Sequence, residues 1–473
     1  MSADQKRPHA AGTAVTGAQV VGRQGVVAIL ASTFGWSLDL FDLFILLFVA
    51  PTIAPLFFPS DSPTLSLAAT YASFAVTLLM RPVGSALFGH MADTSGRRRA
   101  MIVAVVGVGL ATATFAVLPT HGTVGLLAPV LFILLRLVQG VFVGGVVAST
   151  HTIGTESVPE RYRGAMSGLI GGGGAALGAL LASLIYYAVS SLFPGHEFAV
   201  WGWRVMFATG IISSIFGVLL FRVLEESPLF KQAADNPRPA KAPLRRLLAR
   251  EQLPTFLLSL LVVIGGGSMY YLTSGYLPTY LGVIKKIDRP TAALILAASS
   301  VVVFFAAVLA GQLSEWIGRR RAFLVIGVIA LVGLPVTNKL MENAHSLTAV
   351  TLAAMGIGIF GNIGYAPVLV FLNERFPTAM RATGTGVTWN VGFAIGGMMP
   401  TVVTLVSPTV ADIPGRLVLF TTASAVLYLA GAVLSKETRG TIESEEPPAG
   451  ADGDLLLLRR PRLTDAPAIR VES

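Results

Sequence analysis

The sequence predicts an all-α membrane protein in which twelve membrane-crossing helices form two related bundles of six. Hydrophobic residues make up 53% of its 473 residues and charged residues only 12%, whereas soluble domains carry about 25% charged residues. A second observation is a loop that occurs twice, as GHMADTSGRRR at Gly89–Arg99 and as GQLSEWIGRRR at Gly311–Arg321. Composition therefore indicates a membrane protein, and the repeated loop indicates two halves.

Long apolar runs give the number of crossings. A helix needs about 20 mostly apolar residues to cross a bilayer, and glycine or proline within a run does not rule out a membrane helix. Twelve runs satisfy this requirement: 26–52, 66–90, 100–118, 127–153, 165–190, 203–223, 254–281, 291–313, 322–340, 349–372, 383–406 and 415–434.

Polar stretches divide the chain. We expect an N-terminal tail at 1–25, a six-helix bundle at 26–223, a linker at 224–252, a second six-helix bundle at 253–435 and a tail at 436–473. The linker is rich in proline and charge, and the last tail is polar enough to be disordered.

The repeats are in register. Gly89 and Gly311, Asp93 and Glu315, Gly96 and Gly318, and Arg97 and Arg319 are each 222 residues apart, and Arg98 and Arg320 follow them. A second motif recurs 218 residues apart, as Glu156–Pro159–Arg163 and as Glu374–Pro377–Arg381. Such repeats predict two bundles related by an axis along the membrane normal.

Basic residues predict the orientation. The repeated loops, the linker and both tails hold most of the Lys and Arg residues, and the positive-inside rule then places both termini in the cytoplasm. Lys285, Lys286 and Arg289 fall in an outer loop against this trend. We expect the plasma membrane as the location and the lipid bilayer as a partner.

The sequence lacks the residue patterns that several classes of function require. It has no cysteine, and its six histidines lack the spacing of metal ligands. The basic residues lie in short clusters between apolar runs, which argues against nucleic-acid binding. With no nucleophile–base pair or nucleotide loop, we expect no enzyme activity, no cofactor and no metal.

The repeated loop resembles the inner-loop motif of the major facilitator superfamily, Gly-x-x-x-Asp-Arg-x-Gly-Arg-Arg, with Thr94 in place of the first arginine. Stretches such as RLVQGVFVGG, ESVPERYRG, WGWRVMF and LEESPLF resemble the metabolite:proton symporter branch. The resemblance implies a monomeric secondary transporter that works by alternating access, with its substrate site near the midplane. Val146 stands where that branch has a glutamate, which excludes proton coupling through that position.

Asp39 and Asp42 are the candidates for proton coupling. A charge at bilayer depth costs about 2.5–3.5 kcal/mol on insertion scales, so such residues usually face a cavity or a partner. Their spacing places them on one helix face, where two close carboxylates favour holding a proton between them. The alternative roles are substrate binding and a gate or helix-pairing contact.

The candidates for substrate binding are polar residues within the spans. Arg136 can bind a carboxylate through two hydrogen bonds, or it can form a structural ion pair with Asp39 or Asp42. Arg81 is expected to form an ion pair or to extend towards the membrane surface. The other candidates, each with helix packing as the alternative role, are Gln139, Tyr270, Tyr271, Asn362 and Asn390.

The repeated loops are candidates for an inner gate. Asp93 and Glu315 can pair with neighbouring arginines or with the positive N-termini of helices in the opposite half. We expect these contacts to hold the inner face shut, although the arginines also fix the topology. The predicted gate residues are Gly89, Asp93, Gly96, Arg97, Arg98, Gly311, Glu315, Gly318, Arg319 and Arg320.

Arg136 and the two buried acids favour proton-coupled uptake of a small organic anion. The alternatives are symport of a zwitterionic osmolyte, uncoupled facilitated diffusion, drug efflux and a transporter-like sensor. In the favoured case and in most of these alternatives, the partner is a small-molecule substrate.

Overall fold

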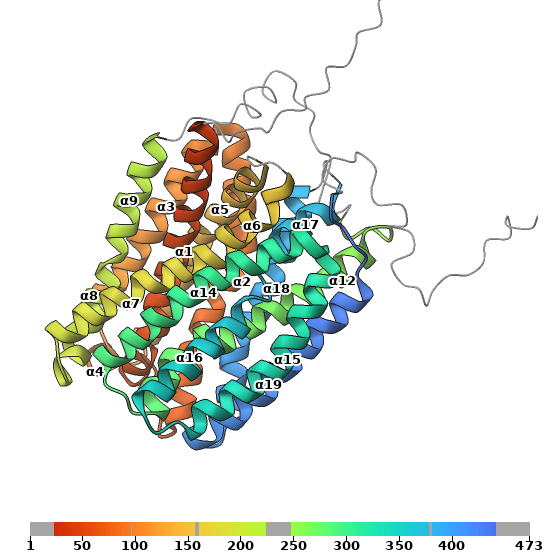
Figure 1. The fold of residues 1–473 in the computed structure, drawn as a ribbon. Helices are drawn as coiled ribbons and strands as arrows, with labels where there is room; N and C mark the ends of the chain where they lie inside the picture. Colours follow the sequence, from red (N-terminus) through yellow and green to blue (C-terminus); the bar gives the residue numbers. More distant parts are fainter. Residues whose placement is uncertain (1–22, 96, 157–159, 224–246, 378–380, 441–473) are drawn as a thin grey trace, which may run out of the picture.

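The computed structural model describes residues 23–95, 97–156, 160–223, 247–377 and 381–440. These residues form helices joined by short turns, packed side by side with their axes roughly aligned (Figure 1). The all-helical fold predicted from composition is confirmed.

The first half supplies six crossings. Three of these crossings combine α-helix with a short 3-10 or π-helical segment. The glycines at 171–174 lie where one π-helical segment continues into an α-helix. The helices of this half are α1 (Arg23–Phe57), α2 (Pro63–Ser95), α3 (Arg97–Thr114) with η1 (Phe115–Val117), α5 (Leu127–Glu156), α6 (Arg163–Gly168) with η3 (Leu169–Gly173) and α7 (Gly174–Leu192), and η4 (Phe198–Gly202) with α8 (Trp203–Ala208) and α9 (Gly210–Val223). The short helix α4 (His121–Val124) connects two crossings.

The second half repeats this order. Its helices are α12 (Leu253–Tyr270) with η5 (Tyr271–Gly275), α13 (Leu277–Thr279) and η6 (Tyr280–Ile284), α14 (Arg289–Ile317), α15 (Arg319–Asn343), α16 (Leu347–Asn362) with α17 (Val368–Arg375), α18 (Arg381–Leu405), and α19 (Ile413–Leu434) after the short turn η7 (Val410–Asp412). The predicted span 349–372 is therefore two helices, because the chain turns at residues 363–367.

The helices are long and apolar enough for a membrane. Ten described helical segments have the length and composition of a crossing, and Leu347–Asn362 is a shorter apolar helix. Together with α18 these account for the twelve predicted crossings. The chain is a multi-pass membrane protein with two six-helix bundles.

The two bundles meet along two pairs of helices. In Figure 1, α14 of the second half lies beside α7 and α6 of the first, and α18 lies against α2. We call the end at which Arg23 begins α1 and Gly440 ends the described chain the inner end, and the opposite end the outer end. The remaining parts of the predicted tails and linker (1–22, 224–246 and 441–473) lie outside the described residues.

Glycines allow the bundles to approach closely near the inner end. A methyl group added at Gly311 of α14 would overlap the carbonyl oxygen of Gly164 and come within 2.8 Å of the Cα atom of Gly168. Small residues at such positions let helix backbones pack together in a membrane. Gly311, predicted from sequence as part of the gate motif, thus lies at the crossing of α6 and α14.

We predict that Gly311→Ala weakens this crossing. The added methyl group has no space, and overpacking costs about 1–3 kcal/mol, so the inner end should open more often. The chain has no natural cysteine, which makes a single introduced thiol a clean reporter. Maleimide labelling of Gln312→Cys should become about tenfold faster.

Gly386→Ala is the matched control, because nothing lies within 4 Å of a methyl group placed there. Equal labelling rates in the two alanine variants would show that the crossing tolerates the extra group.

Candidate transport site

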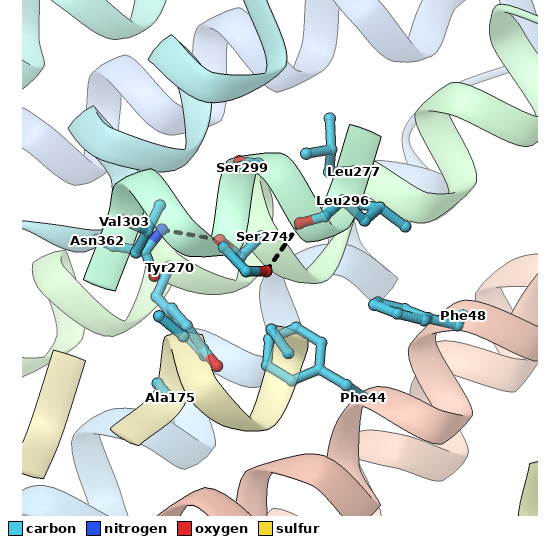
Figure 2. A pocket seen from close by; sticks show the side chains of 13 residues that line it. Phe44, Phe48, Ala175, Tyr270, Ser274, Leu277, Leu296, Ser299, Val303 and Asn362 are labelled. Atoms are coloured by element: carbon cyan, nitrogen blue, oxygen red, sulfur yellow. Dashed lines mark hydrogen bonds between the residues drawn. The ribbon is translucent and has the colours of Figure 1, made fainter. Parts of the chain in front are cut away.

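A small cavity lies between the two halves (Figure 2). Its volume is about 20 Å³, enough for a single water molecule and too small for an organic solute. The first half contributes apolar side chains and the second half contributes the hydroxyl and amide groups. The lining residues are Phe44, Phe48, Ala175, Ala176, Ala179, Tyr270, Ser274, Leu277, Leu296, Ser299, Ser300, Val303 and Asn362.

The amide and serine hydroxyl groups of the cavity bond to one another and to nearby backbone. Asn362 Nδ2 donates to Ser274 Oγ at 2.7 Å and to the carbonyl oxygen of Gly358 at 2.5 Å. Ser300 Oγ donates to the carbonyl oxygen of Leu296 at 2.8 Å, one helical turn earlier. None of the residues that line this cavity carries a charge.

A break in the tenth crossing positions two of the nearby side chains. Helix α16 ends at Asn362, and α17 starts only at Val368. Non-helical backbone at this depth is tolerated where protein covers it, and residues 361–376 are all buried. The hydroxyl of Tyr428 in α19 donates to the carbonyl oxygen of Gly364 within the break. The break turns Asn362 towards the cavity and Tyr365 towards the aromatic side chains described next.

An aromatic cluster surrounds the cavity on its α18 side. Tyr270 packs edge-on against Tyr271 and Tyr365, with ring centroids 5.0 and 5.1 Å apart, and its ring lies 6.3 Å from that of Phe44. The hydroxyls of Tyr270 and Tyr365 have no hydrogen-bond partner in the structure. The central aromatic cluster consists of Trp36, Phe44, Tyr270, Tyr271, Tyr365, Trp389 and Phe393.

One buried ion pair lies next to this cluster. Arg81 Nη2 of α2 is 3.4 Å from Asp39 Oδ2 of α1, and the two residues are 2% and 4% exposed. Both charges act electrostatically on Tyr270 and Tyr271. Of the two expectations for Arg81, the ion pair is therefore correct.

Asp42 lies in a second polar group inside the first bundle. Its Oδ2 atom accepts a hydrogen bond from Ser213 Oγ at 3.0 Å. Arg136 donates to Gln139 Oε1 at 2.6 Å, and Gln139 donates to Thr112 Oγ1 at 2.7 Å. Asp42 and Arg136 attract each other electrostatically.

Aromatic rings enclose the Arg136 guanidinium. Its central carbon lies 4.3 Å from the ring centroid of Phe115 and 5.2 Å from that of Phe132, and two of its nitrogens, Nε and Nη2, have no hydrogen-bond partner. An arginine on aromatic faces gains cation–π attraction. Arg136 is thus held inside one bundle rather than at the cavity between the two.

The predicted substrate residues divide into three groups. Tyr270 and Asn362 line the cavity, and Tyr271 belongs to the aromatic cluster beside it. Asn390 donates to the carbonyl oxygen of Gly386 at 2.9 Å and to Ser85 Oγ at 3.5 Å, which joins α18 to α2. Gln139, like Arg136, does not line the cavity.

Sequence reasoning missed the three serines of the cavity. Serines at 274, 299 and 300 are common residue types in membrane helices and carry no motif.

The second copy of the repeated loop forms a charged cluster at the inner end. Arg319 donates through Nη2 to Glu315 Oε2 at 2.8 Å and to Glu374 Oε1 at 2.9 Å, and through Nε to Glu374 Oε2 at 3.0 Å. Glu374 belongs to the second repeated motif, so the two motifs meet in space. Charge-assisted pairs of this geometry are the strong ones.

The same cluster connects the two halves. Glu315 Oε2 also accepts from the backbone N–H of Gly164, at the start of α6 in the first half, at 2.9 Å. Glu315 therefore has both kinds of partner that the sequence predicts, an arginine and a helix N-terminus. That these contacts act as a releasable gate stays a prediction.

Residues assigned to the C-terminal tail pack on this cluster. Glu437 Oε1 accepts from the backbone N–H of Arg319 at 2.7 Å, and Oε2 accepts from that of Arg320 at 3.2 Å. Thr438 Oγ1 donates to Glu374 Oε2 at 2.8 Å. Residues 436–440 are thus part of the packed structure rather than of the tail, because their polar groups bind the ends of α14, α15 and α17. Gly318, with φ +92°, lies against Glu437.

In the first copy of the loop, Gly89 lies within α2. Gly96 and the side chains of Asp93, Arg97 and Arg98 lie outside the described part of the structure. Helix α2 continues to Ser95, and α3 begins at Arg97.

Contacts at the outer end also join the halves. Tyr71 of α2 stacks on Tyr276, with ring centroids 5.2 Å apart, and its hydroxyl lies 2.7 Å from Thr279 Oγ1. The two halves are therefore in contact at both ends in this structure. A cavity between two bundles that meet at each end is the arrangement of an alternating-access transporter.

Comparison with known proteins agrees with this arrangement. The Major Facilitator Superfamily profile matches residues 26–401. The chain belongs to the Major Facilitator Superfamily and is a transporter of small molecules rather than an enzyme.

Curated relatives are similar over most of their length. The chain is 29% identical to the inner membrane metabolite transport protein YhjE of Escherichia coli over 417 residues, which cover 87% of this chain and 94% of the relative. It is 27% identical to the proline/betaine transporter of Salmonella typhimurium, over 90% of this chain and 86% of the relative. It is 28% identical to the glycine betaine/proline/ectoine/pipecolic acid transporter OusA of Dickeya dadantii, over 79% and 76%.

A solved structure shares the fold. The proton:xylose symporter XylE superposes with a TM-score of 0.69 at 16% identity, over 88% of this chain and 97% of that one. This likeness confirms the twelve-helix fold.

We predict that Asp39 and Arg81 depend on each other. Removal of one partner of a buried pair leaves an uncompensated charge, at a cost of about 3–5 kcal/mol. Asp39→Asn and Arg81→Gln should therefore each lower the folded yield or the initial transport rate by more than tenfold.

The double variant Asp39→Asn with Arg81→Gln should recover folding, measured by thermal unfolding in detergent, because it leaves no unpaired charge. A double variant as unstable as the sum of the two single variants would show that the pair is not coupled.

Proposed function

We propose that this transporter carries small zwitterions that combine a carboxylate with an ammonium group, of the proline and betaine class, together with protons. The observation that carries the proposal is the absence of charge among the residues that line the cavity. A solute with no net charge suits this lining.

Electrostatics separates this proposal from transport of an organic anion. Burial of an unpaired charge is expensive, and an anion would bring net negative charge beside the neighbouring Asp39–Arg81 pair, which is itself neutral overall. A zwitterion brings both charges and can interact with both members of this pair. The names of the curated relatives, which include proline/betaine transporters, also favour the zwitterion over the organic anion expected from Arg136.

The aromatic cluster suits the ammonium end. Faces of Tyr and Trp attract quaternary and secondary ammonium groups, with a gain of about 0.5–2 kcal/mol each. Tyr270 and Tyr365 also have hydroxyls without partners, which can bind a carboxylate. Entry of the substrate requires these rings to move, because the cavity has a volume of only about 20 Å³.

Asp42 is the residue we assign to proton coupling. It is 2% exposed, and one of its oxygens, Oδ1, has no hydrogen-bond partner. Arg136 is its nearby positive charge. If helix movements during transport separate the two, the carboxylate has to take up a proton, since a lone buried carboxylate is unstable.

The orientation and location follow from the basic residues. We propose that the inner end faces the cytoplasm, that both termini lie there, and that the protein works as a monomer in the plasma membrane. The arginines at 319–321 lie at that end, where α15 begins, as the positive-inside rule requires.

We predict which solutes proteoliposomes containing this protein will accumulate. Radiolabelled glycine betaine and proline should accumulate when the outside is acidic, and α-ketoglutarate and citrate should not. An ionophore that abolishes the pH gradient should reduce accumulation to equilibration. Accumulation of the dicarboxylates in preference to betaine would contradict the proposal.

We predict that Asp42→Asn separates coupling from binding. The amide cannot exchange a proton but keeps the size and hydrogen bonding of the side chain, so accumulation driven by a pH gradient should be lost. Counterflow exchange of betaine, which needs no net proton movement, should continue. Ser213→Ala, which removes only the hydroxyl that donates to Asp42, should keep pH-driven accumulation. Unchanged accumulation against a gradient by Asp42→Asn would refute this role.

A further inference from the structure

A second, larger cavity lies at the outer end between the two halves. Its volume is about 540 Å³, within the range of small-molecule sites. The first half contributes α1, α7 and the turn after α7, and the second half contributes η6 and the start of α14. We call it the outer vestibule; its lining includes Phe48, Thr52, Tyr186, Pro278, Asp288 and Arg289.

Phe48 separates the vestibule from the central cavity. Its side chain lines both, and Figure 2 shows its ring at the edge of the central cavity, beyond Phe44. The ring packs against Phe44 and Tyr186, with centroids 5.7 and 5.6 Å apart. A solute that moves from one cavity to the other has to displace this ring.

The vestibule differs from the central cavity in carrying two opposite charges. Arg289 lies over the ring of Phe198, 4.7 Å from its centroid, and donates through Nη1 to the carbonyl oxygen of Gly195 at 3.2 Å. Tyr186 lies beside the same guanidinium. Asp288 accepts from the backbone N–H of Thr291 at 3.1 Å and caps α14.

We propose that the outer vestibule is a second, transient binding site for the transported zwitterion. This inference rests on the proposed substrate class. Arg289 binds the carboxylate, and the faces of Tyr186 and Phe48, with Asp288, attract the ammonium group. Phe48 then admits the solute to the uncharged central cavity.

The chemistry of Arg289 supports exchange at this site. Its long bond to a neutral carbonyl is weaker than a bond to a carboxylate, since charge-assisted hydrogen bonds are about twice as strong as neutral ones. A bound carboxylate can thus replace Gly195 as acceptor. Stacking on Phe198 fixes the plane of the guanidinium, which prepares it for two parallel hydrogen bonds.

Kinetics distinguish binding from a structural contact between the halves. With reconstituted full-length protein, Arg289→Gln should raise the KM for betaine uptake about tenfold and leave the maximal rate unchanged. Arg289→Lys, which keeps the charge without the planar fork, should give an intermediate KM. Arg416→Gln removes an exposed arginine at the outer end of α19 that does not line the vestibule, and this variant should behave as the unmodified protein.

If the Arg289 variants change the maximal rate but not the KM, Arg289 holds the halves together instead of binding substrate. If they change neither the KM nor the maximal rate, the inference is also overturned. Betaine uptake by the unmodified protein tests the proposed function separately. If it fails, both proposals fall; if it succeeds and the arginine variants match it, only the vestibule site falls.

Thiol protection gives a direct measure of occupancy. A cysteine introduced as Thr52→Cys lies in the vestibule, and one introduced as Ser60→Cys lies in the exposed turn after α1. Saturating betaine should slow labelling of the first by an impermeant maleimide several-fold, and leave the second unchanged.

In a variant that carries both Thr52→Cys and Arg289→Gln, betaine should no longer slow the maleimide labelling of the introduced thiol. Protection that persists in the Arg289→Gln background, or no protection at all, would exclude the site.

Discussion

The pairing of charges within a membrane protein is the constraint on which this structure depends. A charge left without a partner at bilayer depth is costly, and the chain forms buried ion pairs in two separate places. Asp39 pairs with Arg81 between the helices of the first bundle, and Arg319 pairs with Glu315 and Glu374 at the inner end. The residues that line the cavity between the bundles are left uncharged, which sets the kind of solute that suits them.

Individual hydrogen bonds add to the helix packing between the halves at both ends. Near the inner end, glycines of α6 and α14 meet backbone to backbone, and Glu315 binds the N–H of Gly164. At the outer end, Tyr71 meets Thr279. Single hydrogen bonds contribute about 0.5–1.5 kcal/mol, so either end can open without loss of a whole bundle interface. This balance is what alternating access requires.

Much of the fold could be predicted because its signals are local. Apolar runs of bilayer length define the crossings, and two repeats in register define the halves. The site was predicted less well, because side-chain direction depends on packing. Arg136 and Arg81 are both buried arginines in apolar helices; Phe115, Phe132 and Gln139 hold the first inside one bundle, whereas the second reaches Asp39 beside the aromatic cluster.

The sequence by itself determined the membrane class, the twelve crossings and the superfamily, since these depend on composition, length and motif spacing. Only the tertiary structure decided which polar residues meet. It brought Glu374 and Glu437 to Arg319 across more than 50 residues of chain. It also broke the tenth crossing at residues 363–367, where burial within protein replaces the helical bonds that lipid would demand. These contacts and this break depend on residues of other helices, so a local sequence pattern does not predict them.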